Sequence, residues 1–244
     1  LHLSLRRQRQ MCIRDSLLIT GASAGIGLSA AKLFLDSGYA VINFSRRACP
    51  EKRALHFTAD LSDPDFFTPI KDELEKRLEG AEEIVLVHNA ARLNNDTVDS
   101  TDSNDLRQTM EINLIASNTL NKNLIPLMKT GSSILYIGST LSEKAVPNSF
   151  SYVTSKHAVI GMMRATCQDL ISTGIHTSCI CPGFTDTEMV REHVPDEFMD
   201  WIKEMSSYGR LVDPEEIANT ILWASQNPVI NGSVLHANLG QIES

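Results

Sequence analysis

The sequence predicts an α/β fold in which a doubly wound parallel sheet of about seven strands carries helices on both faces. Three observations predict it. Short apolar runs alternate with longer amphipathic stretches from residue 17 onward, a glycine-rich turn follows the first apolar run, and no repeat or linker divides the chain. A chain of 244 residues with 42% hydrophobic residues can bury one sizeable core. Residues 17–244 are therefore expected to form a single domain.

Seven apolar runs are predicted to be strands because each is short and bounded by turn residues. They are residues 17–19, 40–44, 54–57, 84–88, 133–138, 175–181 and 233–237. Helical periodicity is found between them at residues 25–37, 64–79, 103–129, 149–173 and 213–226. The stretch 45–53 is too short to hold a helix, so a loop is expected between the second and third strands.

Composition argues against several classes of partner. Lys and Arg total 22 against 30 Asp and Glu, and a net charge of -8 offers no basic surface for nucleic acid. No apolar run approaches the roughly 20 residues that span a bilayer. Five cysteines without disulfide or metal-ligand spacing favour a reduced, cytoplasmic location, and Cys179 and Cys181 are predicted to be buried strand thiols. Residues 1–16, a basic stretch with little periodicity, are expected to be a non-native or disordered leader.

The turn after the first strand has the glycine spacing of a phosphate-binding loop. Gly21 permits a tight turn, Gly25 lets the backbone approach a pyrophosphate, and Gly27 allows close helix packing. The helix that follows supplies backbone N–H donors and positive potential at its N-terminus. This order of strand, glycine turn and helix is typical of a Rossmann-type nucleotide-binding domain. We predict cofactor contacts from Gly21, Ser23, Ala24, Gly25, Ile26 and Gly27.

The residues that end the second strand favour NADP(H) over NAD(H). An NAD site usually has an acidic residue here that binds the ribose 2′-hydroxyl, whereas this chain has Ser45, Arg46 and Arg47. Guanidinium groups bind a 2′-phosphate through charge-assisted hydrogen bonds. Ser45 and Arg46 are therefore the predicted contacts, and Arg46 is preferred to Arg47. A solvated basic loop is the alternative that these residues leave open.

Tyr152 and Lys156 lie four residues apart and therefore share one face of a predicted helix. Tyrosine ordinarily titrates at about pH 10, so it is a poor base unless a nearby positive charge favours the phenolate. The pair alone is common on helix surfaces. Its context is Ser139, which follows the fifth strand thirteen residues before Tyr152. Ligands of such sheets bind at the carboxyl ends of the strands.

Together with the glycine turn, these motifs resemble the short-chain dehydrogenase/reductase family in its compact single-domain branch. The resemblance covers residues 17–240. It implies that Tyr152 donates or accepts the substrate proton and that Ser139 binds the carbonyl oxygen. It also implies that Lys156 favours the phenolate and holds the nicotinamide ribose. Asn113 matches the helix asparagine that helps to hold a proton-relay water.

Other cofactor contacts follow from the same resemblance. Asp60 and Leu61 match the residues at the adenine, although Asp60 could instead be a helix cap. The family motif around Asn89 and Ala90 departs at His88 and Ala91, and His88 is expected to be a structurally bonded histidine rather than a catalytic acid. The nicotinamide end is expected to contact Pro182, Gly183, Thr185 and Thr187.

The resemblance implies an NADP(H)-dependent oxidoreductase that reduces a small ketone or aldehyde, or catalyses the reverse, without a metal. A non-catalytic NADP(H)-binding regulatory protein and a non-redox epimerase or dehydratase are the alternatives. Residues 184–208, which combine apolar and charged side chains, are predicted to form a substrate lid, or else to pack against the body or another subunit. A homodimer or homotetramer is expected through helices at 103–129 and 149–173.

Overall fold

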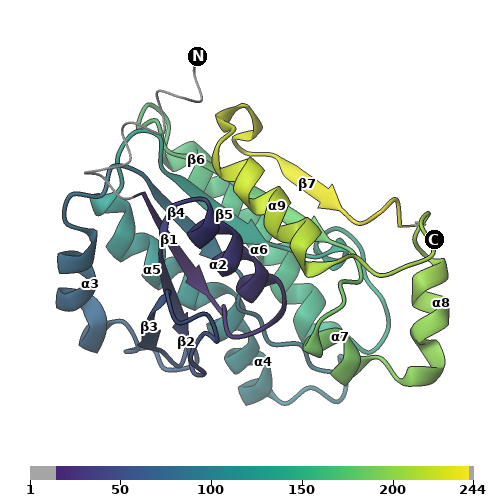
Figure 1. Cartoon of the computed structure of the whole chain (residues 1–244). Helices are drawn as coiled ribbons and strands as arrows, with labels where there is room; N and C mark the ends of the chain where they lie inside the picture. The colour runs from purple at the N-terminus through teal and green to yellow at the C-terminus, as the bar shows by residue number, and fades with distance from the viewer. Residues whose placement is uncertain (1–14, 242–244) are drawn as a thin grey trace.

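The seven predicted strands form one parallel sheet in the order β3-β2-β1-β4-β5-β6-β7 (Figure 1). The computed structural model describes residues 15–241, so Cys12 and most of the predicted leader lie outside the described residues. The strand bounds are β1 Ser16–Thr20, β2 Ala40–Ser45, β3 Leu55–Thr58, β4 Ile84–His88, β5 Ser133–Ile137, β6 His176–Pro182 and β7 Val234–Ala237. Strand β1 begins one residue earlier than predicted, because Ser16 pairs with Ala40, and Ser16 therefore belongs to the fold.

Helices form in all five stretches where helical periodicity was found, and two more α-helices form in the predicted lid at 184–208. They are α2 Gly25–Asp36, α3 Lys71–Leu78, α4 Ser103–Met110, α5 Ala116–Leu124, α6 Phe150–Asp169, α7 Glu188–His193, α8 Met199–Glu204 and α9 Pro214–Ser225. No helix forms between β2 and β3, as the short stretch 45–53 predicted. Among residues 15–241, no helix combines the length and apolar character that crossing a bilayer would require.

Two predicted helices are wrong in part. The helix expected at 64–79 becomes α-helical only at Lys71, after a 3₁₀ turn at Thr68–Ile70. Pro69 lacks an N–H and its ring blocks a continuous α-helix through this position. The helix expected at 103–129 is interrupted by a π-turn at Glu111–Ile115, which widens the helix around Asn113, and it ends in a 3₁₀ turn at Ile125–Leu127.

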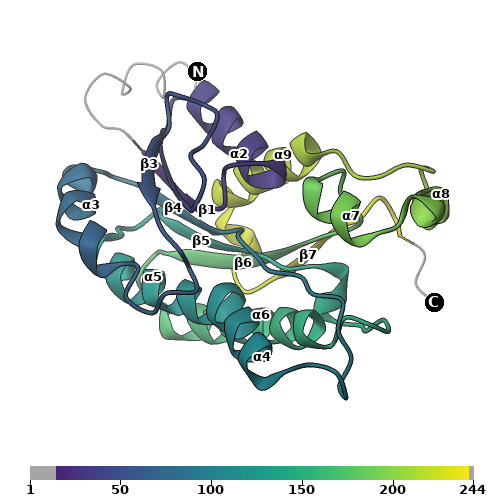
Figure 2. The ribbon, with the colours of Figure 1, turned by 90° about the horizontal axis from the view of Figure 1, so that it is seen from below.

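Each face of the sheet has its own hydrophobic core. Leu17 packs with Phe34 in the core under α2 and α9, while the next residue, Leu18, packs with Leu120 and Met163 in the core under α5 and α6. Successive strand side chains point to opposite faces, so both faces must be covered when the strand is apolar throughout. Figure 2 shows α2 and α9 on one side of the sheet and α4, α5 and α6 on the other. The doubly wound fold is thus confirmed.

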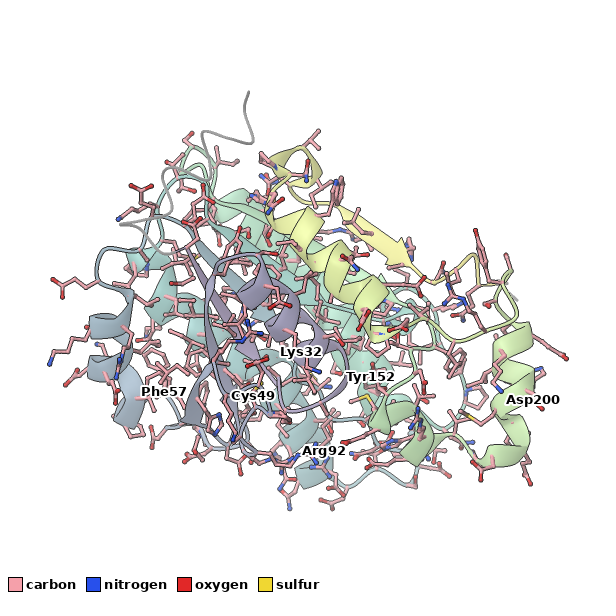
Figure 3. The ribbon with its side chains drawn as sticks, in the orientation of Figure 1. Lys32, Cys49, Phe57, Arg92, Tyr152 and Asp200 are labelled. Carbon is pink, nitrogen blue, oxygen red and sulfur yellow. The ribbon has the colours of Figure 1, made fainter. Side chains whose placement is uncertain are left out.

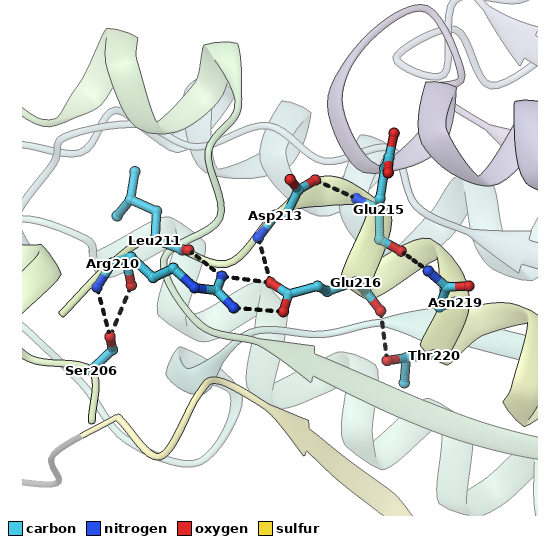
Figure 4. A network of polar contacts seen from close by, with 8 residues as sticks. All are labelled: Ser206, Arg210, Leu211, Asp213, Glu215, Glu216, Asn219 and Thr220. Carbon is cyan, nitrogen blue, oxygen red and sulfur yellow. Dashed lines mark hydrogen bonds and ion pairs between the residues drawn. The ribbon is translucent and has the colours of Figure 1, made fainter. Parts of the chain in front are cut away.

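A polar network attaches the end of the predicted lid to the start of α9 (Figure 4). The Glu216 carboxylate accepts two hydrogen bonds from the Arg210 guanidinium, both at 2.7 Å, and one from the Asp213 N–H at 2.8 Å. The Arg210 bonds stabilise the charged carboxylate and lower the pKa of Glu216 to about 2. The Ser206 hydroxyl donates to the Arg210 carbonyl at 2.8 Å, so the chain just before α9 is held in place.

Replacing Asp213 with Ala is expected to lower the free energy of unfolding by about 1 kcal/mol, the usual effect of losing an N-cap. The Asp213 carboxylate accepts the Glu215 N–H at 2.8 Å, and Ala removes this acceptor from the first turn of α9. Urea denaturation followed by circular dichroism measures the change. Asp213→Asn is the matched control because its side-chain oxygen keeps the cap, and an equal loss in both variants would contradict the capping role.

Candidate active site

The residues that the sequence singled out gather at one edge of the sheet, where neighbouring strands end. The glycine turn follows β1, Asn89 follows β4, Ser139 follows β5 and Gly183 follows β6. Because β1, β4, β5 and β6 are adjacent in the sheet, these four chain segments lie next to one another. Tyr152, labelled in Figure 3, enters this edge from the first turn of α6. The carboxyl edge of a doubly wound sheet is the usual place for a ligand.

The glycine turn has a backbone that only glycine accommodates easily. Gly21 and Gly25 have φ angles of 76° and 52°, in the left-handed region that glycine favours. A Cβ atom on Gly27 would lie 2.3 Å from the Gly21 carbonyl oxygen, closer than such atoms can approach. The turn is fastened on both sides, since Asn43 Oδ1 accepts the Ala22 N–H at 2.9 Å and Asn89 Nδ2 donates to the Thr20 carbonyl at 3.0 Å.

The start of α2 can receive an anion. Its N-cap residue, Ala24, provides no side-chain cap, and the first turn of α2 contains no acidic residue. Backbone N–H groups at the first turn of a helix therefore face the turn without a competing carboxylate. Thr187 lies directly opposite, because a Cβ atom on Gly25 would meet its Cγ2 atom at 3.0 Å. This cradle of backbone donors fits the pyrophosphate of a dinucleotide.

Charged residues surround the end of β2. The Ser45 hydroxyl donates to the Arg47 carbonyl at 2.6 Å and accepts from Asn43 Nδ2 at 2.8 Å. The Arg47 guanidinium pairs with Glu188 of α7 at 3.0 Å, and Arg46 and Arg47 are both exposed. Hydrogen bonds from the Ser62 N–H and hydroxyl lower the pKa of Asp60, and the nearby Arg46 charge adds to that effect. Because β2 and β3 lie on the same side of β1 in the sheet, Arg46 and Asp60 lie on the same side of the glycine turn.

The predicted Asp60 and Leu61 contacts differ in character. Asp60 accepts its hydrogen bonds from Ser62 in a local turn between β3 and the 3₁₀ turn, and it does not cap a helix. The Leu61 side chain belongs to the core, at 8% exposure, so only its backbone can face a ligand. On the opposite side of the turn, Thr185 is buried and its hydroxyl donates to the Gly183 carbonyl at 3.0 Å.

Tyr152 and Lys156 are brought together as the helical spacing predicted. Their side chains are 7% and 3% exposed, and the Lys156 Nζ atom lies 5.5 Å from the centroid of the Tyr152 ring. Nζ donates a hydrogen bond to the Ile137 carbonyl at 2.7 Å, which fixes the ammonium group under the end of β5. The structure therefore places a buried ammonium group beside a buried phenol at the carboxyl edge of the sheet.

Ser139 is held by the 3₁₀ turn that follows it. Its Oγ atom accepts the Leu141 N–H at 3.1 Å, and its own N–H donates to the Ser142 hydroxyl at 3.0 Å. The two bonds make a capping box at the end of β5. The Leu141 N–H uses a lone pair of the Ser139 hydroxyl oxygen and not its proton, so the hydroxyl can still donate one hydrogen bond.

Asn113 occupies the π-turn and joins the loop after β4 to the helix of Tyr152. Its Oδ1 atom accepts the Arg92 N–H at 2.7 Å, while Nδ2 donates to the Arg92 carbonyl and to Ser155 Oγ, each at 2.9 Å. Ser155 in turn donates to the Tyr152 carbonyl at 2.8 Å. The side chain of Asn113 is therefore engaged with backbone and Ser155, and its hydrogen bonds do not reach Lys156.

Sequence reasoning missed the residues that fix the loop after β4. Asp96 Oδ1 accepts the Ser151 N–H at 3.0 Å. The Asp96 backbone N–H donates to the Asn148 carbonyl, and the Asp96 carbonyl accepts the Phe150 N–H. Asp96, in the loop after β4, therefore holds the start of α6. An acidic group at a helix N-terminus is favourable. The only signal was the acidic and polar character of the loop. Asn43 was missed as well, although a polar residue inside an apolar strand could have drawn attention to it.

Two residue groups near the site are structural, as expected. His88 Nε2 lies 2.8 Å from Asn121 Oδ1, and Asn121 Nδ2 donates to the Tyr136 hydroxyl at 2.7 Å. Burial lowers the pKa of His88 to about 4, so its ring is neutral near pH 7 and is a poor proton donor there. Cys179 and Cys181 are fully buried, with their Sγ atoms 3.9 Å apart.

The segment predicted as a lid contains α7, a 3₁₀ turn at Asp196–Phe198 and α8. Thr187 caps α7 by accepting the Val190 N–H. The apolar residues of this segment differ in burial. Ile202 is 3% exposed, whereas Phe198 and Trp201 are 48% and 58% exposed. Part of this segment therefore packs on the body, and part presents apolar surface to solvent.

Comparison with known proteins agrees with this arrangement. A short-chain dehydrogenase family model, described as enoyl-(acyl carrier protein) reductase, matches residues 21–241. The chain belongs to the short-chain dehydrogenase/reductase family. A crystal structure of a short-chain dehydrogenase family protein from Francisella tularensis superposes with a TM-score of 0.86 at 25% identity, over 93% of this chain and 98% of that one.

Two curated relatives of the family are redox enzymes by name. An ipsdienol dehydrogenase from Ips pini is 29% identical over 241 residues, covering 91% of this chain and 94% of the relative. Carbonyl reductase family member 4 from Xenopus laevis is 27% identical over 227 residues, covering 89% and 93%. This short-chain dehydrogenase/reductase is accordingly an oxidoreductase.

Proposed function

We propose that this enzyme interconverts a small ketone or aldehyde and its alcohol with NADP(H), using Tyr152 as the general acid and base. One observation carries the proposal: the buried Tyr152 ring lies beside the buried Lys156 ammonium, at the same sheet edge as Ser139 and the glycine turn. Two relatives named as a carbonyl reductase and a dehydrogenase support the same reaction class.

The residues that would hold the cofactor follow the sheet edge. The pyrophosphate would lie on the backbone of residues 21–27, the adenine beside Asp60 and the backbone of Leu61, and the 2′-phosphate near Ser45 and Arg46. When bound, the nicotinamide supplies or accepts the hydride at the carbonyl carbon. Its ribose and ring would be held by Asn89, Ala90, Lys156, Pro182, Gly183, Thr185 and Thr187.

The chain itself positions the substrate oxygen and manages its proton. Ser139 donates a hydrogen bond to the oxygen, because its hydroxyl proton is not used by the 3₁₀ turn. Tyr152 gives its phenolic proton to the same oxygen as negative charge develops there. Lys156 stabilises the phenolate that remains until a proton from solvent replaces the one transferred. Asn113 and Ser155 fix the backbone at Tyr152, which keeps the hydroxyl in place.

Arg46→Ala is expected to raise KM for NADPH about tenfold or more while KM for NADH changes less than about twofold. Loss of one charge-assisted contact to a 2′-phosphate accounts for this size, and NADH lacks that phosphate. Initial rates with each cofactor measure it. Arg47→Ala is the matched control because Arg47 is already paired with Glu188. If both variants change both cofactors equally, Arg46 does not select NADPH.

We also propose a homodimer or homotetramer located in the cytoplasm. Ile115, at 42% exposure, is an apolar residue on the segment at 103–129 that we expect at the subunit contact. Cys49, Cys167, Cys179 and Cys181 are free thiols, which suits a reducing compartment. Sedimentation equilibrium and cell fractionation test the two statements, and a monomer or an exported protein would overturn the respective one.

The proposed reaction is tested by the consumption of NADPH and NADH over a panel of ketones, aldehydes, quinones and 3-oxoacyl thioesters. We expect NADPH consumption with at least one carbonyl class and formation of the matching alcohol. A folded protein that binds NADPH tightly, yet turns over no member of the panel in either direction, would contradict the proposal and favour a regulatory protein.

A further inference from the structure

His193 ends α7, and each of its two ring nitrogens lies within hydrogen-bonding distance of a backbone carbonyl oxygen. Its Nδ1 atom lies 2.9 Å from the Met189 carbonyl oxygen in its own helix. Its Nε2 atom lies 2.9 Å from the carbonyl oxygen of Leu93, a residue 100 positions earlier in the chain. Figure 2 shows how α7 stands beyond the end of β6. The Nε2 contact therefore links segments that follow two different strands.

Both partners of the His193 ring are backbone carbonyl oxygens, which accept hydrogen bonds and cannot donate them. A neutral imidazole carries one N–H and can donate only once, whereas the imidazolium donates from both nitrogens. The two contacts can therefore be hydrogen bonds at the same time only when the ring is protonated. We propose that His193 is a positioning residue that, as an imidazolium, closes the lid helix α7 onto the β4 loop, a role that rests on the proposed function.

The loop that receives His193 is fixed to the candidate catalytic residues. The Arg92 backbone is bonded twice by the Asn113 side chain, and the Asp96 carboxylate accepts the Ser151 N–H beside Tyr152. Leu93 lies between these two anchors. A bond from α7 to Leu93 therefore sets the position of the lid relative to the helix that carries Tyr152.

The other end of α7 is positioned against the glycine turn. Thr187 caps the helix there and lies opposite Gly25, at the 3.0 Å approach described above. A helix of six residues is about 9 Å long, so α7 extends from the cofactor cradle to the β4 loop. Loss of the His193 contact would free one end of this short helix while Thr187 holds the other.

Most charged side chains on the two elements around His193 have their own partners. On the loop, Arg92 pairs with Asp105, and Asp96 is the only carboxylate in residues 91–96. On α7, Glu188 pairs with Arg47 and Arg191 pairs with Asp186, while Glu192 is exposed. The negative end of the α7 dipole, where His193 lies, favours a cation. The carbonyl oxygens and the helix end thus provide the setting for an imidazolium.

The proposal predicts a pH dependence that a purely structural histidine would not show. Deprotonation of the His193 ring at higher pH removes one of its two donors and opens the lid. KM for the carbonyl substrate should rise about tenfold between about pH 6 and about pH 8.5, the effect of one charge-assisted bond, while kcat changes less. In His193→Gln, KM should be high at both pH values.

Hydrogen exchange of the α7 amides tests the contact between His193 and Leu93 without any turnover. In the NADPH-bound protein, protection of residues 190–194, corrected for intrinsic exchange, should fall between about pH 6 and about pH 8.5 in the wild type and be low throughout in His193→Gln. His157→Gln is the matched control, because exposed His157 contacts a single carbonyl, that of Val153, at 3.0 Å. It should behave as the wild type.

Two outcomes would overturn the proposal. Wild-type protection that does not change with pH would show that the imidazolium does not hold α7. This outcome is measured on the wild type alone, so it does not depend on whether a variant folds. Protection that persists in His193→Gln would show that other contacts close the lid. Because exchange is measured without a substrate, either result is distinguishable from failure of the proposed carbonyl reduction.

Discussion

Tyr152→Phe is expected to lower kcat about a thousandfold, because general acid and base catalysis contributes about 10²–10⁴ in rate. The variant keeps the aromatic ring, which is 7% exposed, so folding and NADPH affinity should remain close to those of the wild type. Only the hydroxyl that would protonate the substrate oxygen is lost. Steady-state kinetics, with NADPH binding followed by fluorescence, measures the two effects separately.

Tyr208→Phe is the matched control for that substitution. Tyr208 loses the same hydroxyl, but its side chain is 70% exposed and lies at the end of the lid segment. We expect its kcat to stay within about twofold of the wild type. If Tyr152→Phe kept more than a tenth of the wild-type kcat, another group would have to supply the proton, and the assignment of Tyr152 would be wrong.

Gly27→Ala is expected to weaken NADPH binding by at least about tenfold and to lower the free energy of unfolding by about 2 kcal/mol. The new methyl group would lie 2.3 Å from the Gly21 carbonyl oxygen and 2.7 Å from Asn89 Nδ2. Both neighbours belong to the fastened turn, so the backbone that faces the pyrophosphate must move. Fluorescence titration and urea denaturation give the two quantities.

Gly161→Ala provides a control of opposite sign. Gly161 lies within α6, and a Cβ atom there would meet no atom within 4 Å. Ala is favoured over Gly in a helix, so this variant should gain about 0.5–1 kcal/mol of stability and bind NADPH as the wild type does. A Gly27→Ala variant that behaved like Gly161→Ala would contradict the close packing of the turn.

The fold could be predicted from the sequence because its signals are local. The strands are buried on both faces and therefore stand out as short apolar runs, each within two residues of its observed bounds. The errors arose where a local exception overrides periodicity. Pro69 delays the start of α3, and the π-turn around Asn113 interrupts a helical pattern that looks continuous in the sequence.

The candidate site was predictable only where its residues share one motif. Tyr152 and Lys156 lie on adjacent turns of one helix, so their spacing predicted that the two side chains would lie close together. The contacts of Asp96 with Ser151 and of His193 with Leu93 connect segments 55 and 100 residues apart. No periodicity encodes such contacts, because they arise when loops after different strands meet at one sheet edge.

The most direct test of the account follows a deuterium atom. NADPH carrying deuterium at the transferable position of the nicotinamide is incubated with the enzyme and each carbonyl compound, and the alcohol is analysed by mass spectrometry. We predict an alcohol with one deuterium on the former carbonyl carbon, formed about a thousandfold more slowly with Tyr152→Phe. NADPH consumed without deuterium on that carbon, or unchanged transfer in Tyr152→Phe, would contradict tyrosine-assisted hydride transfer at this site.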